Sequence, residues 1–163
     1  MMNNIDFKLI HVEIADMKIA QGQNILRTIL GSCVGICLYD AVTKIGGMAH
    51  IMLPSGQNTD FLKAKYADTA IPFLLQNMIS SGAKKERVVA KIAGGAKMFA
   101  LPAASKIAAI GDNNVKSVKD ILSSMNIRLI SEDTGGENSR TISFFLEDGR
   151  VKIKRIGTPE KII

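Results

Sequence analysis

The sequence contains few of the residues on which metal centres and nucleic-acid platforms depend. Its 163 residues include two cysteines, Cys33 and Cys37, and two histidines, His11 and His50, while tryptophan is absent. A four-ligand zinc site would need all four of these residues at unfavourable spacings, so no metal and no cofactor are expected. Aromatic residues make up only 5% of the chain, which is too few for a base-stacking platform, so nucleic acid is not an expected partner.

The sequence also lacks a segment suited to crossing or entering a membrane. No run of about 18 uninterrupted apolar residues is present, and the N-terminal segment does not have the pattern of a signal peptide. We therefore expect a cytoplasmic protein with reduced thiols and no membrane insertion. An excess of 21 Lys and Arg over 15 Asp and Glu gives a net charge of +6 at pH 7. This charge favours acidic partners of any class, and it is the only feature that favours nucleic-acid binding.

Short apolar and β-branched segments dominate the chain, and they predict an α+β fold with a largely antiparallel sheet. Alternating or continuous apolar patterns predict strands at residues 7–14, 25–30, 33–39, 45–53, 88–92, 128–130, 141–146 and 151–156. The last two strands are expected to form a hairpin through Asp148 and Gly149. The length suits one compact domain, residues 1–163.

Helical spacing of apolar residues predicts two helices. The first covers residues 65–81 and ends at Gly82. Pro72 lies inside this range, so either the regular helix begins near Thr69 or it is kinked at the proline. The second helix carries Val115 to Met125 and is expected to be capped by Asn113 or Asn114.

The segment of residues 28–54 offers a candidate catalytic pair. If the two strands on either side of Ala41–Val42 form a hairpin centred there, Cys33 lies opposite His50. A facing imidazole can take the thiol proton, so Cys33 is a candidate nucleophile and His50 a candidate general base. A bulge at Gly46–Gly47 would shift this register by one residue and separate the two side chains.

Spacing alone leaves a second interpretation open for each of these residues. Free cysteine is among the most buried residue types, so Cys33 could be an ordinary core residue, as we expect for Cys37. His50 could be a core histidine whose ring has found a hydrogen-bond partner. His11 has no candidate nucleophile near it in the sequence and is expected to be structural.

Glycines near the candidate nucleophile could shape the site. Gly31 and Ser32 precede Cys33, and this backbone could let main-chain N–H groups converge on an oxyanion. Gly94–Gly95 and Gly135–Gly136 have neither the lysine of a P-loop nor the spacing of a dinucleotide site. They are expected to be turns that bring backbone close to a cleft.

Several motifs occur in an order that is typical of one known family. They are Thr28 ahead of LGSCV, LYD at the end of the same strand, GGMAHIMLP around His50, KYADTAIP, KIAGGAKMF and SEDTGG. Over about residues 25–136 the chain resembles the chemoreceptor glutamine deamidases, the CheD family. The resemblance implies an α/β sandwich with largely antiparallel, mixed sheets and no metal.

The same resemblance implies a hydrolase of the chemotaxis system. Its members convert side-chain amides of particular receptor glutamines to glutamate with release of ammonia, through a cysteine thioester. The resemblance makes Cys33 the nucleophile, His50 the base and Thr28 the residue that supports the histidine. It implies chemoreceptors (methyl-accepting chemotaxis proteins) and a CheC-like phosphatase as partners. The alternative is a non-catalytic regulator that binds these partners through the same cleft.

The chain departs from the family pattern at one place. Where an arginine is expected after Ile-Gly, the segment reads Ile110-Gly111-Asp112-Asn113-Asn114. The departure does not affect the candidate catalytic residues. It removes the residue through which this segment near Asp112 would be expected to contact a receptor or partner.

Overall fold

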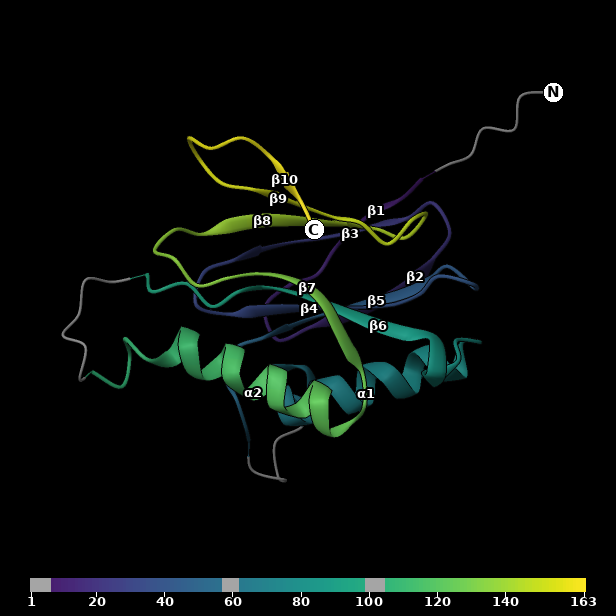
Figure 1. Ribbon diagram of the computed structural model, residues 1–163, viewed down its shortest axis with the longest axis horizontal. Helices are drawn as coiled ribbons and strands as arrows, with labels where there is room; N and C mark the ends of the chain where they lie inside the picture. The colour runs from purple at the N-terminus through teal and green to yellow at the C-terminus, as the bar shows by residue number, and fades with distance from the viewer. Residues whose placement is uncertain (1–6, 57–61, 99–104) are drawn as a thin grey trace.

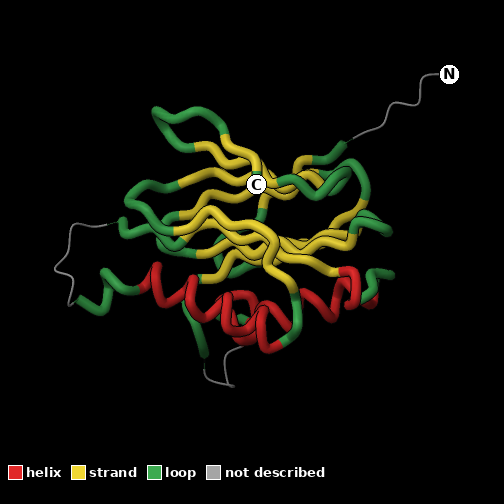
Figure 2. Tube along the Cα trace, in the orientation of Figure 1, coloured by secondary structure: helices red, strands yellow, loops and turns green. Residues whose placement is uncertain are grey.

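The computed structural model describes residues 7–56, 62–98 and 105–163. These residues form ten strands in two five-stranded sheets and two long helices, which confirms the predicted α+β class. Figure 1 shows three layers, with one sheet on the outside, the second sheet in the middle and both helices on the other side of the second sheet. Figure 2 shows the same layering by secondary structure, with the helices gathered on one side.

We call the two sheets the outer sheet and the central sheet. The outer sheet has the order β1 (Leu9–His11), β3 (Ile25–Leu30), β8 (Arg140–Phe145), β9 (Val151–Lys154) and β10 (Lys161–Ile162). The central sheet has the order β2 (Met17–Gln21), β5 (Ile45–Ile51), β4 (Val34–Asp40), β6 (Val88–Gly94) and β7 (Arg128–Thr134). Among the pairs of strands described in these sheets, only β1–β3 and β6–β7 are parallel, so the sheets are mixed and largely antiparallel, as expected.

The helices are α1 (Ala67–Ser80) and α2 (Ile110–Ser124), and two short 3₁₀ turns, η1 (Lys63–Lys65) and η2 (Lys85–Arg87), flank α1. Helix α1 ends before Gly82, whose φ of 113° is suited to glycine, as predicted. The helix begins at Ala67 and runs through Pro72, so of the two alternatives the start near Thr69 is wrong. Pro72 is exposed, so water can reach the carbonyl that lacks its helical partner there. None of the helices in the described ranges is long and apolar enough to cross a membrane.

The middle of the central sheet is buried on both faces, and every residue of β4 and β5 is buried. Val34, Ile36 and Leu38 belong to the core shared with the helices, whereas Cys37 and Tyr39 belong to the core between the two sheets. This alternation confirms the predicted period of two. Cys37 is a core residue, as expected.

Two glycines of β5 allow the three layers to pack closely. A Cβ on Gly46 would collide with Leu146, which follows β8 of the outer sheet, and a Cβ on Gly47 would collide with Leu74 of α1. The β4–β5 ladder runs through both glycines without a break, so the bulge considered at Gly46–Gly47 is absent.

Several boundaries differ from the sequence-based expectations. Strands β2 and β10 were not predicted, β7 extends to Thr134, and β1 covers only part of the expected 7–14 strand. Helix α2 begins at Ile110, so Asn113 and Asn114 lie inside the helix and do not cap it. The predicted β8–β9 hairpin through Asp148 and Gly149 is confirmed. Part of the apolar stretch at 98–109 lies outside the described residues.

Candidate active site

The register of the β4–β5 hairpin differs from the predicted one by two residues. His50 pairs with Gly35, so the prediction that Cys33 lies directly opposite His50 is wrong. A shift of two residues keeps side chains on the same face of a sheet. Cys33 therefore stays on the side of the central sheet that faces the outer sheet, and it packs against the core there.

The turn between the strands explains this register. Asp40 pairs with Ile45, which leaves Ala41 to Lys44 as the connection. An oxygen of Asp40 accepts a hydrogen bond from the Val42 N–H at 3.0 Å, and Lys44 has a φ of 54°. An aspartate-stabilised turn that ends in a left-handed residue is longer than the tight turn assumed from the sequence.

Cys33 lies in the loop that carries the chain from the outer sheet to the central sheet. Its carbonyl oxygen accepts a hydrogen bond from the Gly95 N–H at 2.9 Å, and the Gly31 carbonyl accepts one from the Ala96 N–H at 2.9 Å. Gly94 has a φ of 112°, and a Cβ there would collide with the Cys33 carbonyl oxygen. The Gly94–Gly95 segment therefore brings backbone close to the loop that carries Cys33.

Asn114 ties this loop to the strand that carries the histidine. The side chain is fully buried. Its Nδ2 donates to the Ser32 carbonyl at 3.1 Å and to the Met52 carbonyl at 2.9 Å. One amide group thus connects the residue before Cys33 to the end of the segment that contains His50.

Thr28 and His50 make direct contact between the two sheets. The Thr28 hydroxyl donates to the Val12 carbonyl at 2.7 Å and lies 2.7 Å from His50 Nδ1. The single proton of the hydroxyl is donated to the Val12 carbonyl, so the hydroxyl can only accept a hydrogen bond from His50. Nδ1 of His50 therefore carries a proton and donates it to Thr28. In the neutral ring the lone pair is then on Nε2, and this buried atom has no hydrogen-bond partner among the described residues.

Burial makes both members of the candidate pair neutral. Burial lowers the pKa of His50 to about 4, and only the Val12 backbone opposes this shift. Burial also raises the pKa of the Cys33 thiol, while the N–H of the same residue acts in the opposite direction. In the free protein near pH 7 burial therefore favours a neutral thiol and a neutral imidazole over a thiolate–imidazolium pair.

Thr28 and His50 line an open cavity of about 270 Å³ between the end of β1 and the edge of β3. Other lining residues include His11, Glu13, Arg27, Ile29 and Thr141, whereas Cys33 does not line it. His11, expected to be structural, is exposed at this cavity. Within the described ranges no cluster of three or more His, Cys, Asp or Glu side chains could hold a metal ion.

Comparisons with known proteins agree with the resemblance seen in the sequence. The family model described as "CheD chemotactic sensory transduction" matches residues 52–155. The chain is 44% identical over 162 residues to the probable chemoreceptor glutamine deamidase CheD of Caldanaerobacter subterraneus subsp. tengcongensis, covering 98% of this chain and 100% of the relative. The chain belongs to the CheD family.

Further CheD relatives also match over nearly their full length. The probable chemoreceptor glutamine deamidase CheD of Clostridium novyi is 50% identical over 153 residues, covering 91% of this chain and 93% of the relative. The chemoreceptor glutamine deamidase CheD of Halalkalibacterium halodurans is 43% identical, covering 95% of this chain and 98% of the relative. The family model begins after Thr28, Cys33 and His50, whereas these relatives match over nearly the whole chain.

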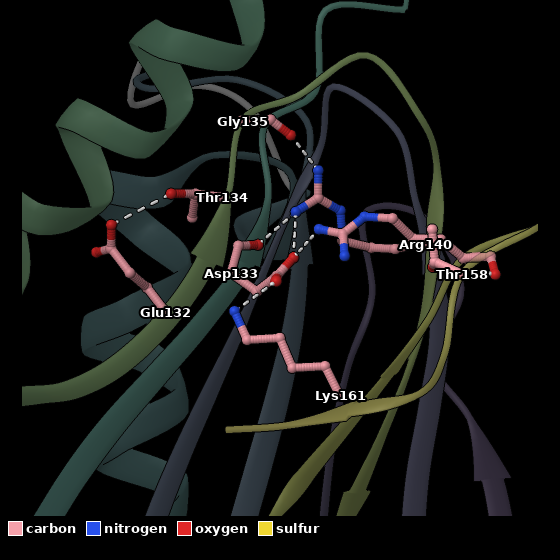
Figure 3. A network of polar contacts seen from close by, with 8 residues as sticks. Glu132, Asp133, Thr134, Gly135, Arg140, Thr158 and Lys161 are labelled. Carbon is pink, nitrogen blue, oxygen red and sulfur yellow. Dashed lines mark hydrogen bonds and ion pairs between the residues drawn. The ribbon is translucent and has the colours of Figure 1, made fainter.

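A cluster of charged residues around the buried Asp133 and Arg140 links strand β7 to the outer sheet near the candidate site (Figure 3). Asp133 at the end of β7 accepts hydrogen bonds from Arg140, Arg155 and Lys161. Arg140 is fully buried, and its Nη1 lies 2.5 Å from the Asp133 carboxylate. Because Arg140 pairs with Leu30, the residue before Gly31, the cluster anchors the strand end from which the Cys33 loop departs.

Asn114 and the Val12 carbonyl are the site features that the sequence did not reveal. Asn114 lies on the helix stripe that also buries Val118 and Leu122, and a polar residue on an apolar stripe is the signal that could have found it. The role of the Val12 carbonyl could not be found in the sequence, because every residue has a backbone carbonyl and the residue type does not show which one accepts a hydrogen bond.

The position at which an arginine was expected lies at the start of α2. There Asp112 forms an exposed ion pair with Lys97 at 3.3 Å.

Proposed function

We propose that this chain is a cysteine-dependent protein-glutamine deamidase. It hydrolyses the side-chain amides of specific glutamines on chemotaxis receptors to glutamate and releases ammonia. The names of the CheD relatives support the substrate class. The observation that carries the mechanism is the orientation of His50, whose Nδ1 is held by Thr28 while Nε2 has no partner within the described part of the chain.

In the first half of the proposed reaction, Cys33 is the nucleophile. When the glutamine amide enters, the thiol turns toward Nε2 of His50, and the imidazole takes its proton as sulfur attacks the amide carbon. The contact with Thr28 stabilises the imidazolium ion and keeps it oriented. The imidazolium then protonates the amide nitrogen, the C–N bond breaks, and ammonia leaves a thioester on Cys33.

In the second half, water completes the hydrolysis. His50 removes a proton from a water molecule as the oxygen attacks the thioester carbon. The C–S bond then breaks, and the proton returns to sulfur. The products are glutamate and the free thiol, so the cycle needs no cofactor.

The backbone before Cys33 is the proposed support for the oxyanion. Ala96 and Asn114 bind the carbonyls of Gly31 and Ser32, which fixes the peptide planes that lead to the Cys33 N–H. A preorganised N–H donor aimed at a developing oxyanion contributes about 3 kcal/mol to transition-state stabilisation.

The test uses a purified cytoplasmic fragment of a chemoreceptor. The wild-type protein should release ammonia and give the mass gain of an amide-to-acid conversion at particular glutamines. Cys33→Ala and His50→Ala should abolish both signals, and Cys37→Ala is the matched cysteine control that should retain them.

The regulator alternative gives a different result in the same experiment. A non-catalytic protein would bind the receptor fragment or a CheC-like phosphatase through the His50 cavity without any mass gain in the receptor. Binding by the wild-type protein with unchanged glutamines would therefore overturn the deamidase proposal.

A further inference from the structure

The outward face of the outer sheet carries no helix within the described ranges. Both helices lie beyond the central sheet, on the opposite side of the molecule (Figure 1). Strand register aligns the outward-facing side chains in rows. One row is Arg27, Ser143 and Lys152, and the neighbouring row is Ile29, Thr141 and Lys154.

These rows form a trough along β8. Ser143 and Thr141 are short side chains on the middle strand, whereas their neighbours on β3 and β9 are long. The resulting hollow of about 230 Å³ has Ser143 and Thr141 at its floor and Lys152 and Lys154 on one wall. We call this feature the β8 trough.

The β8 trough adjoins the cavity that contains the proposed catalytic histidine. Arg27 and Thr141 line both hollows. A polypeptide segment lying in the trough would therefore reach the mouth of the cavity where Thr28 and His50 meet.

The charge of the β8 trough is predominantly positive. Arg27, Lys152 and Lys154 line it, and the opposing carboxylate, Glu160, pairs with Lys152 at 3.3 Å. Arg27 donates through Nε to the Ser143 hydroxyl, so its guanidinium has further donors available. Among the described residues Lys154 has no ion pair, and it is exposed. Glu13 is the carboxylate that lines the adjoining cavity.

We propose that the β8 trough is the docking site for an acidic segment of the receptor next to the target glutamine. The inference rests on the proposed deamidase function and adds a recognition rule to it. Carboxylates of the receptor pair with Lys154, Lys152 and Arg27, and this pairing directs the neighbouring glutamine to the His50 cavity. Charge complementarity of this kind speeds association and selects among partners.

The test compares Lys154→Glu with Lys85→Glu on a purified receptor fragment. Both lysines are exposed and both variants change the net charge equally, but Lys85 lies in η2, outside the trough. For Lys154→Glu we expect kcat/KM to fall by roughly tenfold, mainly through KM, and its salt dependence to flatten. Lys85→Glu should behave as wild type. The rate of Cys33 alkylation by iodoacetamide, which needs no docking, should be unchanged in both.

A second pair of variants and a competitor sharpen the result. Lys152→Gln/Lys154→Glu should lose more affinity than Lys154→Glu, while Lys84→Gln/Lys85→Glu serves as its matched control. Poly-glutamate should inhibit the wild-type protein and should inhibit the trough variants less. Equal losses in trough and control variants, or no loss in either, would overturn the docking site.

Binding of the receptor fragment is measured in parallel with turnover. A wild-type protein that binds the fragment without ammonia release would count against the deamidase function, while the binding data would still test the trough. Turnover that is indifferent to Lys154→Glu would count against the trough alone.

Discussion

The hydroxyl oxygen of Thr28 lies 2.7 Å from Nδ1 of His50, although Thr28 belongs to the outer sheet and His50 to the central sheet. The contact therefore joins the two layers at the candidate site. Because Thr28 also donates to the Val12 carbonyl, it assigns the proton to Nδ1 and leaves the lone pair on Nε2. In the proposed mechanism, the threonine hydroxyl takes the orienting place that a carboxylate has in Ser-His-Asp triads.

Replacement of Thr28 should lower the deamidation rate without unfolding the protein. Thr28→Val keeps the shape of the side chain but removes the acceptor for the His50 Nδ1 proton, so we expect a loss of about 10- to 100-fold in kcat. Thr28→Ser keeps the hydroxyl and should retain most of the activity. Ammonia release from a receptor fragment measures both, and equal rates for the two variants would contradict the orienting role.

Stability should fall as the pH drops from 6.5 to 4 because His50 is buried in its neutral form. Its pKa is lowered to about 4 in the folded protein, whereas an unfolded histidine titrates near 6.5. The unfolded state binds more protons in this window, so the His50 contribution is complete above pH 6.5 and is lost on acidification. The loss is on the order of 3 kcal/mol in the free energy of unfolding.

Urea unfolding across this pH range measures the effect. His50→Gln should flatten the pH dependence between 4 and 6.5, and His11→Gln, at an exposed position, serves as the control variant. Arg87 lowers the pKa of Asp40, so the Asp40 contribution is lost only at lower pH. An unchanged slope in His50→Gln would show that this ring is not the titrating group.

Alkylation of Cys33 in the free protein should accelerate with pH and show no acidic plateau. Burial raises the pKa of this thiol, and the neutral imidazole offers it no positive charge. The rate with iodoacetamide should therefore still be rising between about pH 7 and 9. Because both cysteines fall in one tryptic peptide, tandem mass spectrometry of that peptide distinguishes alkylation of Cys33 from alkylation of the buried Cys37. A rate that is already constant at pH 7 would indicate a preformed thiolate–imidazolium pair.

Removal of the Asn114 amide should impair catalysis and stability together. Asn114→Ala leaves the Ser32 and Met52 carbonyls without these donors, which costs about 1 to 3 kcal/mol in the free energy of unfolding. Freed from this tie, the Cys33 loop and the end of β5 should lose alignment, and kcat should fall by at least about tenfold. Asn113→Ala, at an exposed position on the same helix, is the control. Wild-type kcat in Asn114→Ala would contradict the positioning role.

Breaking the Asp133 cluster should destabilise the fold strongly. Asp133→Ala leaves the fully buried Arg140 without its counter-charge, and such losses cost about 3 to 5 kcal/mol. Asp120→Ala breaks an exposed pair with Lys116 and should change the free energy of unfolding far less, because water screens exposed charges. Urea unfolding at pH 7 compares the two variants. Similar free energies of unfolding would show that the cluster contributes no more than a surface pair.

Local periodicity accounts for the elements that the sequence predicted well. The apolar spacing of α1, the alternation in β4 and the β8–β9 hairpin depend on residues that are close in the chain. Strand β2 was missed because it lies at the edge of the central sheet and is only partly buried, so its pattern is weak. The start of α2 was misplaced because Asn114 binds distant carbonyls instead of capping its own helix.

The sequence by itself determined the α+β class and the face of the sheet on which Cys33 and His50 both lie. Its motifs also indicated the CheD family and named Thr28 as the candidate residue that supports His50. Only the tertiary structure decided that His50 faces Gly35, that its Nε2 has no partner among the described residues, and that Asn114 holds the Cys33 loop. Register depends on turn hydrogen bonds, and the site depends on contacts between segments far apart in the chain. Neither the register nor these contacts can be predicted from the local pattern of apolar and polar residues.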